Sequence, residues 1–145
     1  MNLRVSAIDN SVLNDFPSYS DFIGILSKRV SEEELEKISI VLKKSFDEGA
    51  FGPNDSLHNI ADIIFNMLLY MYTRPNTASS EYIAVTLYPC ARYGNLTVEE
   101  IMLCFGKEIA VMVNGFLNLA RLYDENNDMQ SENYLKLTLT FAEDI

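Results

Sequence analysis

The chain has 145 residues, of which 48% are hydrophobic and 11% aromatic. This length and composition exclude a disordered chain and predict one globular domain, large enough to form a core without disulfides or metal ions. With 21 acidic and 11 basic side chains the net charge is −10, which repels phosphate backbones and argues against direct binding of nucleic acid.

The first part of the sequence carries no clear hydrophobic period. We expect residues 1–18 to be a partly disordered segment and residues 19–145 to form the domain. No signal peptide, transit peptide or apolar run of the ~20 residues needed to span a membrane is present, which predicts a cytoplasmic protein without membrane contact. Cys90 and Cys104 form no CxxC or Cys/His pattern, and we expect two buried thiols in a reducing compartment.

The first strong helix signal is "SEEELEKISIVLKKSFDEG". Ser31 and Glu34 have the spacing of a capping box, and Gly49 is a typical helix stop. The apolar residues between them recur at helical spacing and predict an amphipathic helix. They are Leu35, Ile38, Leu42 and Phe46.

A second helix is predicted over residues 56–74, after a cap at Asn54 or Asp55. It is apolar around much of its circumference, so we expect it to be the central helix of the core. The only histidine, His58, lies at its start, with Asp62 four residues later on the same face. Because a catalytic metal site usually takes three or more protein ligands, we interpret His58 as structural.

A third helix is predicted over "EYIAVTLYPCARYG", after a turn in which Ser79 or Ser80 is expected to provide the cap. Pro89 lies inside this pattern. Since proline has no backbone N–H and clashes with a preceding carbonyl, we expect the helix to kink or end there.

Thr97 and Glu100 form a second capping box, which predicts a short helix over residues 98–105. Gly106 separates it from a longer helix over residues 107–123. The apolar face of that helix contains Ile109, Met112, Val113, Phe116, Ala120 and Tyr123.

A polar connection over residues 124–133 leads to a segment with conflicting signals. In residues 134–142 the residues Leu135, Leu137, Leu139 and Phe141 alternate with polar ones, which is typical of a half-buried strand. A lone strand would have no partner in an otherwise helical chain, so context favours a helix. The predicted fold class is therefore all-α, a bundle of about six or seven helices.

Known catalytic motifs are absent from the sequence. HExxH, GxSxG and glycine-rich phosphate loops do not occur. Glu99 and Glu100 are interpreted as first-turn acids that complement a helix dipole, not as acid or base catalysts.

The segment "TVEEIMLCFGKEIAVMVNGFLNLARL" resembles the region after the His-Asp dyad in the HD-type hydrolase domain of the long RelA/SpoT alarmone enzymes. There a Thr-x-x-x-Ile helix is followed by Phe-Gly and a Val/Ile-rich helix. "QSENYLKLTLTFAEDI" is similar to that family's Glu-Asn-x-Arg-Lys helix leading to Asp-Ile. The resemblance extends over residues 31–145, is strongest from Leu87 onward and rests on scaffold residues. It implies an HD-domain-like helical bundle.

The resemblance also implies what has become of the hydrolase site. His58 would be the remaining first metal ligand, now vestigial. The His-Asp metal dyad falls on Tyr88 and Pro89, and the Glu-Asp pair that activates water falls on Arg92 and Tyr93. Neither a phenol nor a proline suits a hard divalent metal, and the base is replaced by a cation.

Three further positions of the family pattern also differ. The Arg-Lys pair that meets the nucleotide falls near Gly49 and Ala50, where no cation remains, and the Gly-Val-Thr-Lys segment is Gly115 to Asn118 here. The last metal Asp of the family would lie beyond Ile145, so the domain is expected to be truncated at its C-terminus. The family's hydrolases use manganese, and we expect this domain to bind no metal cofactor.

The resemblance therefore implies a catalytically silent HD-like domain of a RelA/SpoT-type (p)ppGpp synthetase, with a structural and regulatory role in the stringent response. Its expected partner is a synthetase domain of the same parent chain. A second hypothesis is a guanine-nucleotide sensor that binds ppGpp or GTP without hydrolysis, using Tyr88, Arg92 and Tyr93. A third is a metal-dependent ppGpp pyrophosphohydrolase with a rebuilt ligand set.

Overall fold

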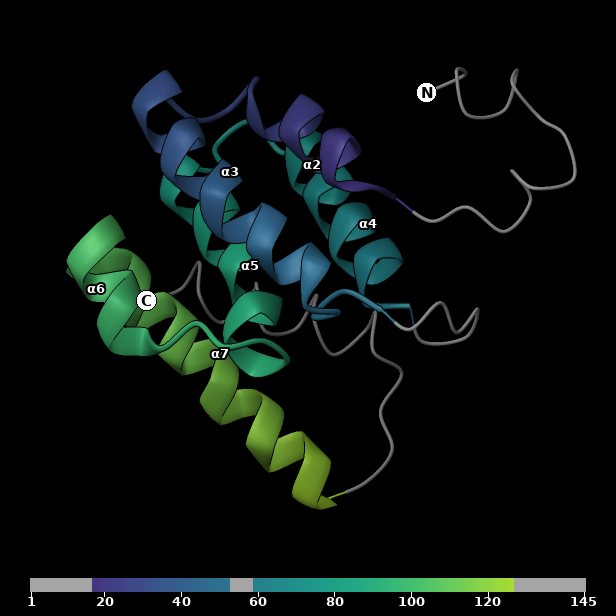
Figure 1. The fold of residues 1–145 in the computed structure, drawn as a ribbon, viewed down its shortest axis with the longest axis vertical. Coiled ribbons are helices and arrows are strands. Elements are labelled where there is room, and N and C mark those ends of the chain that lie inside the picture. Colours follow the sequence, from purple (N-terminus) through teal and green to yellow (C-terminus); the bar gives the residue numbers. More distant parts are fainter. Residues whose placement is uncertain (1–16, 53–58, 127–145) are drawn as a thin grey trace, which may run out of the picture.

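A computed structural model describes residues 17–52 and 59–126, which form an all-α bundle (Figure 1). The predicted fold class is confirmed over these residues. The six helices that the described residues form are α2 (Tyr19–Leu26), α3 (Glu32–Asp47), α4 (Ile60–Tyr72), α5 (Ser79–Arg92), α6 (Val98–Phe105) and α7 (Lys107–Asn126). The predicted disorder before residue 17 and the strand or helix over 134–142 lie outside the described residues.

Helix α2 is an element that the hydrophobic pattern did not predict. The ordered domain was expected to begin near Ser18, and Ser18 is the N-cap of α2, with its backbone N–H donating to Asp21 Oδ2 at 2.8 Å. Phe22 and Leu26 are fully buried and pack α2 against α3 and α4. The serine and aspartate three residues apart were the missed signal for this helix start.

Helix α3 begins and ends as predicted. Glu34 N–H donates to Ser31 Oγ at 3.1 Å, and Ser31 N–H donates to Glu34 Oε1 at 3.1 Å, which completes the capping box. Past its C-terminus, Gly49 has a φ of 87°, a conformation that favours glycine. Ile38 and Leu42 are fully buried, as the helical spacing predicted.

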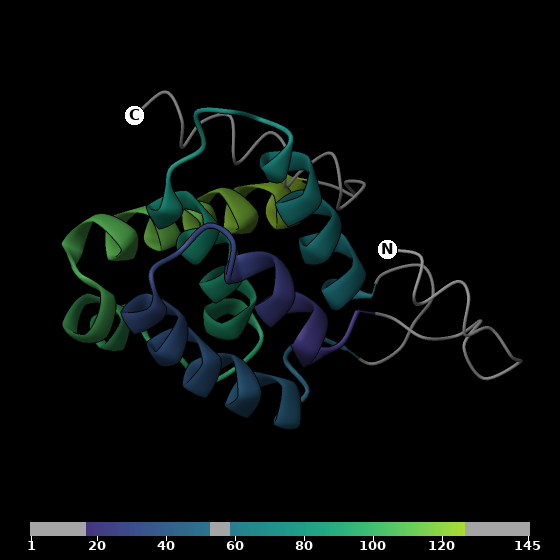
Figure 2. The same ribbon diagram turned by 90° about the horizontal axis from the view of Figure 1, so that it is seen from above.

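The central helix is α5, so the prediction that the second strong helix would be central was wrong. Every residue of α5 from Tyr82 to Cys90 is buried, and the helix packs against α3, α4 and α7 (Figures 1 and 2). Helix α4 buries Met67 and Leu68 but leaves Leu69 41% exposed. Apolar composition on all sides does not distinguish a central helix from one with a solvent-facing side that tolerates apolar residues.

Two predicted helix starts differ in the structure. Helix α4 begins at Ile60, where the Asn59 side chain accepts from Asp62 N–H at 2.8 Å, so the cap is not at Asn54 or Asp55. Helix α5 is not capped by serine, because its N-cap is Ala78, whose N–H donates to Glu81 Oε1 at 2.8 Å. In both cases another nearby polar side chain satisfies the end of the helix.

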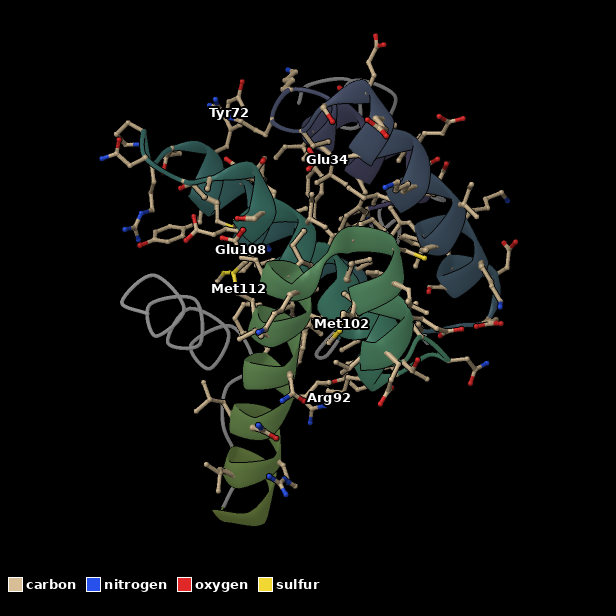
Figure 3. The ribbon with its side chains drawn as sticks, turned by 90° about the vertical axis from the view of Figure 1, so that its left-hand side faces the viewer. Glu34, Tyr72, Arg92, Met102, Glu108 and Met112 are labelled. Atoms are coloured by element: carbon tan, nitrogen blue, oxygen red, sulfur yellow. The ribbon has the colours of Figure 1, made fainter. Side chains whose placement is uncertain are left out.

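Helices α6 and α7 are joined by a single residue, Gly106, with a φ of 102°. The predicted Thr97 capping box is present at the start of α6, with Glu100 N–H donating to Thr97 Oγ1 at 3.1 Å. Helix α7 continues to Asn126, into the stretch predicted to be a polar connection. The C-terminal part of α7 extends beyond the other described helices (Figures 1 and 3).

The prediction of two buried cysteines is half correct. Cys90 is fully buried in α5, whereas Cys104 is exposed on α6. Its neighbours on that short helix, Met102 and Leu103, are also exposed, because α6 buries only Ile101. Within residues 17–52 and 59–126, none of the helices combines the length and apolar character that crossing a bilayer requires.

Candidate functional site at the C-terminal end of α5

The last turn of α5 brings two of the predicted site residues together. Tyr88 and Arg92 are four residues apart on one helix face, and Arg92 Nη1 donates to Tyr88 Oη at 2.6 Å. Tyr88 is only 2% exposed, and its ring meets the ring of Phe116 from α7 edge-on, with centroids 6.0 Å apart. The phenol is therefore held between a guanidinium and an aromatic edge.

Tyr93 is the C-cap residue of α5, and its ring is also close to the Arg92 guanidinium. The Arg92 Cζ is 5.1 Å from the centroid of the Tyr93 ring and 6.0 Å from that of Tyr88. Tyr93 is 45% exposed, while Arg92 is half-buried. The end of α5 thus presents an aromatic face and the positive edge of an arginine to solvent, beside α7 (Figure 3).

Pro89 lies inside α5 and does not end it. The helix continues to Arg92, and the Pro89 carbonyl accepts from Tyr93 N–H at 2.9 Å. Proline leaves the Val85 carbonyl without its usual helical donor, which costs stability. The helix continues because Leu87, Tyr88 and Cys90 on either side of the proline are buried, and their packing offsets that cost.

The thiol of Cys90 faces the interior of the protein. Burial raises the pKa of Cys90 to about 12, and the nearby Ser45 side chain lowers it by a smaller amount. The Sγ–H donates to the Thr86 carbonyl at 3.6 Å. A protonated and enclosed thiol cannot act as a nucleophile or a metal ligand near neutral pH.

The segment after α3 closes the space next to this site. Ala50 is 1% exposed, and a Cβ at Gly94 would lie 3.3 Å from the Ala50 Cβ. The same Cβ would be 2.7 Å from the Cys90 carbonyl oxygen, so Gly94 is required for this close approach. Phe51 stacks on Phe46 with centroids 4.4 Å apart. The structure therefore places Ala50 at the end of α5, as part of the core and not as a solvent-facing loop.

The remaining predicted positions are only partly described. His58 lies outside the described residues, while Asp62 is in the first turn of α4, which begins at Ile60 after the N-cap Asn59. Of the segment Gly115 to Asn118, Phe116 contacts Tyr88 and Asn118 Oδ1 accepts from Arg121 at 3.4 Å.

The side chains at the end of α5 do not fit a divalent metal ion. Of Tyr88 and Pro89, only Tyr88 has a side-chain oxygen. Arg92 donates a hydrogen bond to that oxygen, and the positive charge of Arg92 repels a cation. In the described part of the chain, three or more His, Cys, Asp or Glu side chains do not gather anywhere in a way that could hold a metal ion. A shallow groove does exist, but on the outer face of α3, where Lys43 and Asp47 pair at 3.6 Å in solvent.

Among the described residues, the end of α5 presents the hydrogen-bond donors of Arg92 and the exposed ring of Tyr93. Such a set of groups can bind or pack against a partner. Comparison with known proteins gives no family model, curated protein or solved structure that matches this chain.

Proposed function

We propose that this chain is a catalytically silent, HD-like helical domain of a RelA/SpoT-type protein, which acts as a structural and regulatory partner of a (p)ppGpp synthetase domain. The family assignment comes from the resemblance of the sequence alone. The observation that carries the loss of hydrolysis is the 2.6 Å hydrogen bond from Arg92 Nη1 to Tyr88 Oη. At the positions assigned to metal ligands and base, the side chains satisfy each other.

The packing around Ala50 supports the same proposal. The resemblance assigns a nucleotide-contacting cation to this part of the chain, but Ala50 is buried against the end of α5. An arginine or lysine there would bury an unpaired charge, at a cost of several kcal/mol. Both observations support a domain that holds neither the metal nor the phosphates, while Val113 and Phe116 belong to the core.

The first test is hydrolysis. The purified protein is incubated with manganese and ppGpp, beside an active HD-type hydrolase of the family as positive control. We expect no pyrophosphate above the protein-free blank and less than stoichiometric manganese by elemental analysis. Pyrophosphate release, or one tightly held manganese per chain, would support the rebuilt hydrolase and overturn the silent domain.

The second test addresses the regulatory role. The reading frame that contains this chain is followed past Ile145, where a synthetase domain is expected. That synthetase domain is then assayed for ppGpp formation with and without residues 19–145. A change of at least severalfold in rate supports regulation, whereas an unchanged rate, or a reading frame without a synthetase, removes this half of the proposal.

A guanine-nucleotide sensor is the second candidate, and the exposure of Tyr93 next to Arg92 favours it. A base could stack on the Tyr93 ring while the guanidinium meets a phosphate. Calorimetry with GTP and ppGpp tests this, since heat with a submillimolar midpoint supports a sensor. Tyr93→Ala should abolish that heat, and Tyr70→Ala is the control because Tyr70 is a similarly exposed ring with an arginine, Arg74, 5.6 Å from its centroid. No heat up to millimolar nucleotide excludes it.

A further inference from the structure

Helix α6 carries an apolar patch on its solvent side. The helix lies at the left-hand edge of the bundle in Figure 1 and faces the viewer in Figure 3. Of its eight residues only Ile101 is buried, while Leu103 is 85% exposed and Met102 is 48% exposed. Cys104, the next residue, is also exposed. We call Met102, Leu103 and Cys104 the α6 patch, since adjacent exposed apolar side chains often mark an interaction surface.

The geometry of α6 explains why Leu103 is so exposed. Ile101 is fully buried, and Val98 and Phe105 pack partly against the core. Leu103 follows Ile101 by two residues, which is about 200° further round the helix. Leu103 therefore points away from the core, and a second helix could lie along α6 without displacing a core side chain.

Two charges of opposite sign flank the α6 patch. Glu99, four residues before Leu103, and Lys107, four residues after it, are both exposed. Within residues 17–52 and 59–126 neither of them forms an ion pair. Glu100 differs from Glu99, because its carboxylate accepts from Thr97 N–H at 2.9 Å. Glu99 and Lys107 are therefore the charged groups beside the patch that a partner could engage.

The order of these residues is complementary to itself about Leu103. In an antiparallel pair of helices with a two-fold axis at Leu103, residues equally far before and after it lie level with each other. Glu99 of each copy then meets Lys107 of the other, and Met102 meets Cys104. Lys107 is the first residue of α7, and its long flexible side chain allows for the turn at Gly106. Two attractive charge pairs thus flank an apolar contact.

Ile40 on α3, the next most exposed large hydrophobic residue among those described, lacks this property. It is 68% exposed and lies near the middle of its helix. The level pairs about Ile40 are one attractive pair and two repulsive ones: Glu36 with Lys44, Glu33 with Asp47, and Lys37 with Lys43. Charge complementarity therefore favours a second copy of the chain at α6 and disfavours one at α3.

We propose that α6 is a self-association surface, on which α6 of a second copy of this chain packs in the antiparallel direction through the α6 patch. Glu99 and Lys107 of each copy pair with Lys107 and Glu99 of the other, and these pairs fix the orientation. The contact is weak, because it is centred on one eight-residue helix and because the net charge of −10 on each chain opposes association.

The test is sedimentation equilibrium of the full chain from micromolar to millimolar concentration. The ionic strength is about 0.15 M, at which exposed charges more than ~8 Å apart are largely screened. We expect a reversible equilibrium between monomer and dimer, with a dissociation constant of about 0.1 mM because the contact is small. A monomer at every concentration overturns the proposal and leaves the α6 patch to a different partner. Growth beyond the dimer also overturns it, since a two-fold contact closes with two copies.

Two variants locate the contact. Leu103→Ser should abolish the dimer over this concentration range. Ile40→Ser, the matched control, removes an exposed apolar side chain from α3 and should dimerise as the wild type does. Both side chains are far from fully buried, so both variants should fold, and circular dichroism checks this. A dimer that survives Leu103→Ser, or that both changes weaken equally, would show that the chains do not associate through α6.

A charge exchange tests the antiparallel orientation. Glu99→Lys should weaken the dimer about tenfold, because two attractive pairs become repulsive, and Lys107→Glu should do the same. The double variant has both pairs with their signs exchanged and the net charge of the wild type, so it should regain the wild-type dissociation constant. A double variant that dimerises no better than either single variant would rule out the proposed arrangement.

Discussion

Arg92 Nη1 lies 2.6 Å from Tyr88 Oη, so a guanidinium and a phenol one turn apart on α5 form a short hydrogen bond at the edge of the core. The bond is assisted by the charge of Arg92 and partly shielded from water, since Tyr88 is almost fully buried. Such bonds contribute more than neutral ones at the surface.

Tyr88→Phe removes the acceptor while keeping the ring against Phe116. We expect the free energy of unfolding to fall by about 1.5 kcal/mol, because Arg92 loses a charge-assisted bond. Urea denaturation followed by circular dichroism measures the change. Tyr72→Phe, at an exposed position, serves as the control and should change stability by less than ~0.5 kcal/mol. If both variants unfold at the same urea concentration, the bond has no net effect on stability.

Gly94→Ala should destabilise the domain by roughly 2 kcal/mol, because the added Cβ would lie 2.7 Å from the Cys90 carbonyl oxygen and the backbone must move. Gly115→Ala is the matched control. Among the described residues its Cβ would meet no heavy atom of another segment within 4 Å, and alanine favours the helical backbone of α7, so a gain of about 0.5–1 kcal/mol is expected. Thermal unfolding of the two variants should shift in opposite directions, and shifts in the same direction would contradict this account.

Thr97→Ala should lower the free energy of unfolding by about 1 kcal/mol, because Glu100 N–H loses its acceptor at the start of α6. Ser79→Ala tests the capping role that the sequence suggested for α5. Since Ala78 and Glu81 already form that helix start, this variant should be neutral within a few tenths of a kcal/mol. A loss in Ser79→Ala as large as that in Thr97→Ala would show that the start of α5 has been misinterpreted.

The two cysteines should react very differently with a thiol reagent. Cys104 is exposed and should be modified rapidly at pH 8, whereas Cys90 is enclosed and should react only after unfolding. Mass spectrometry of the native and denatured protein counts the modified thiols. One modified thiol in the native protein and two in the denatured protein are expected, and rapid modification of Cys90 in the native state would contradict its burial.

The raised pKa of Cys90 also predicts a pH dependence of stability. Its thiol ionises near 9 when the chain is unfolded and at about 12 when it is folded. The folded state therefore holds the proton over that range, and the contribution of Cys90 to stability is complete below pH 9 and is lost as the pH rises toward 12. Cys90→Ala should unfold with a weaker dependence on pH over this window than the wild type. An unchanged dependence would mean that Cys90 is accessible to solvent.

The sequence predicted the helices whose ends are encoded locally. Ser31 with Glu34 and Thr97 with Glu100 are three residues apart, so the caps of α3 and α6 could be recognised without knowledge of the fold. Gly106 and Gly49 marked helix ends for a similar reason, since both adopt a positive φ.

The predictions that failed depended on contacts between distant parts of the chain. Helix α4 is more continuously apolar than α5, yet α5 is the central helix because α3, α4 and α7 surround it. The exposure of Cys104 follows from the position of α6 at the edge of the bundle, which periodicity does not specify. The bond between Arg92 and Tyr88 could have been anticipated from their four-residue spacing.

Gly106 is the only residue between α6 and α7, and it serves both helices. Its N–H donates to the Met102 carbonyl at 3.1 Å, and its carbonyl accepts from Ala110 N–H at 3.2 Å. The two helices also pack against each other, so neither can swing away without losing that contact. In hydrogen-exchange experiments the two helices should therefore open together, as a single cooperative unit. Lys37 of α3, which donates to the Cys104 carbonyl at 3.2 Å, would be released in the same event.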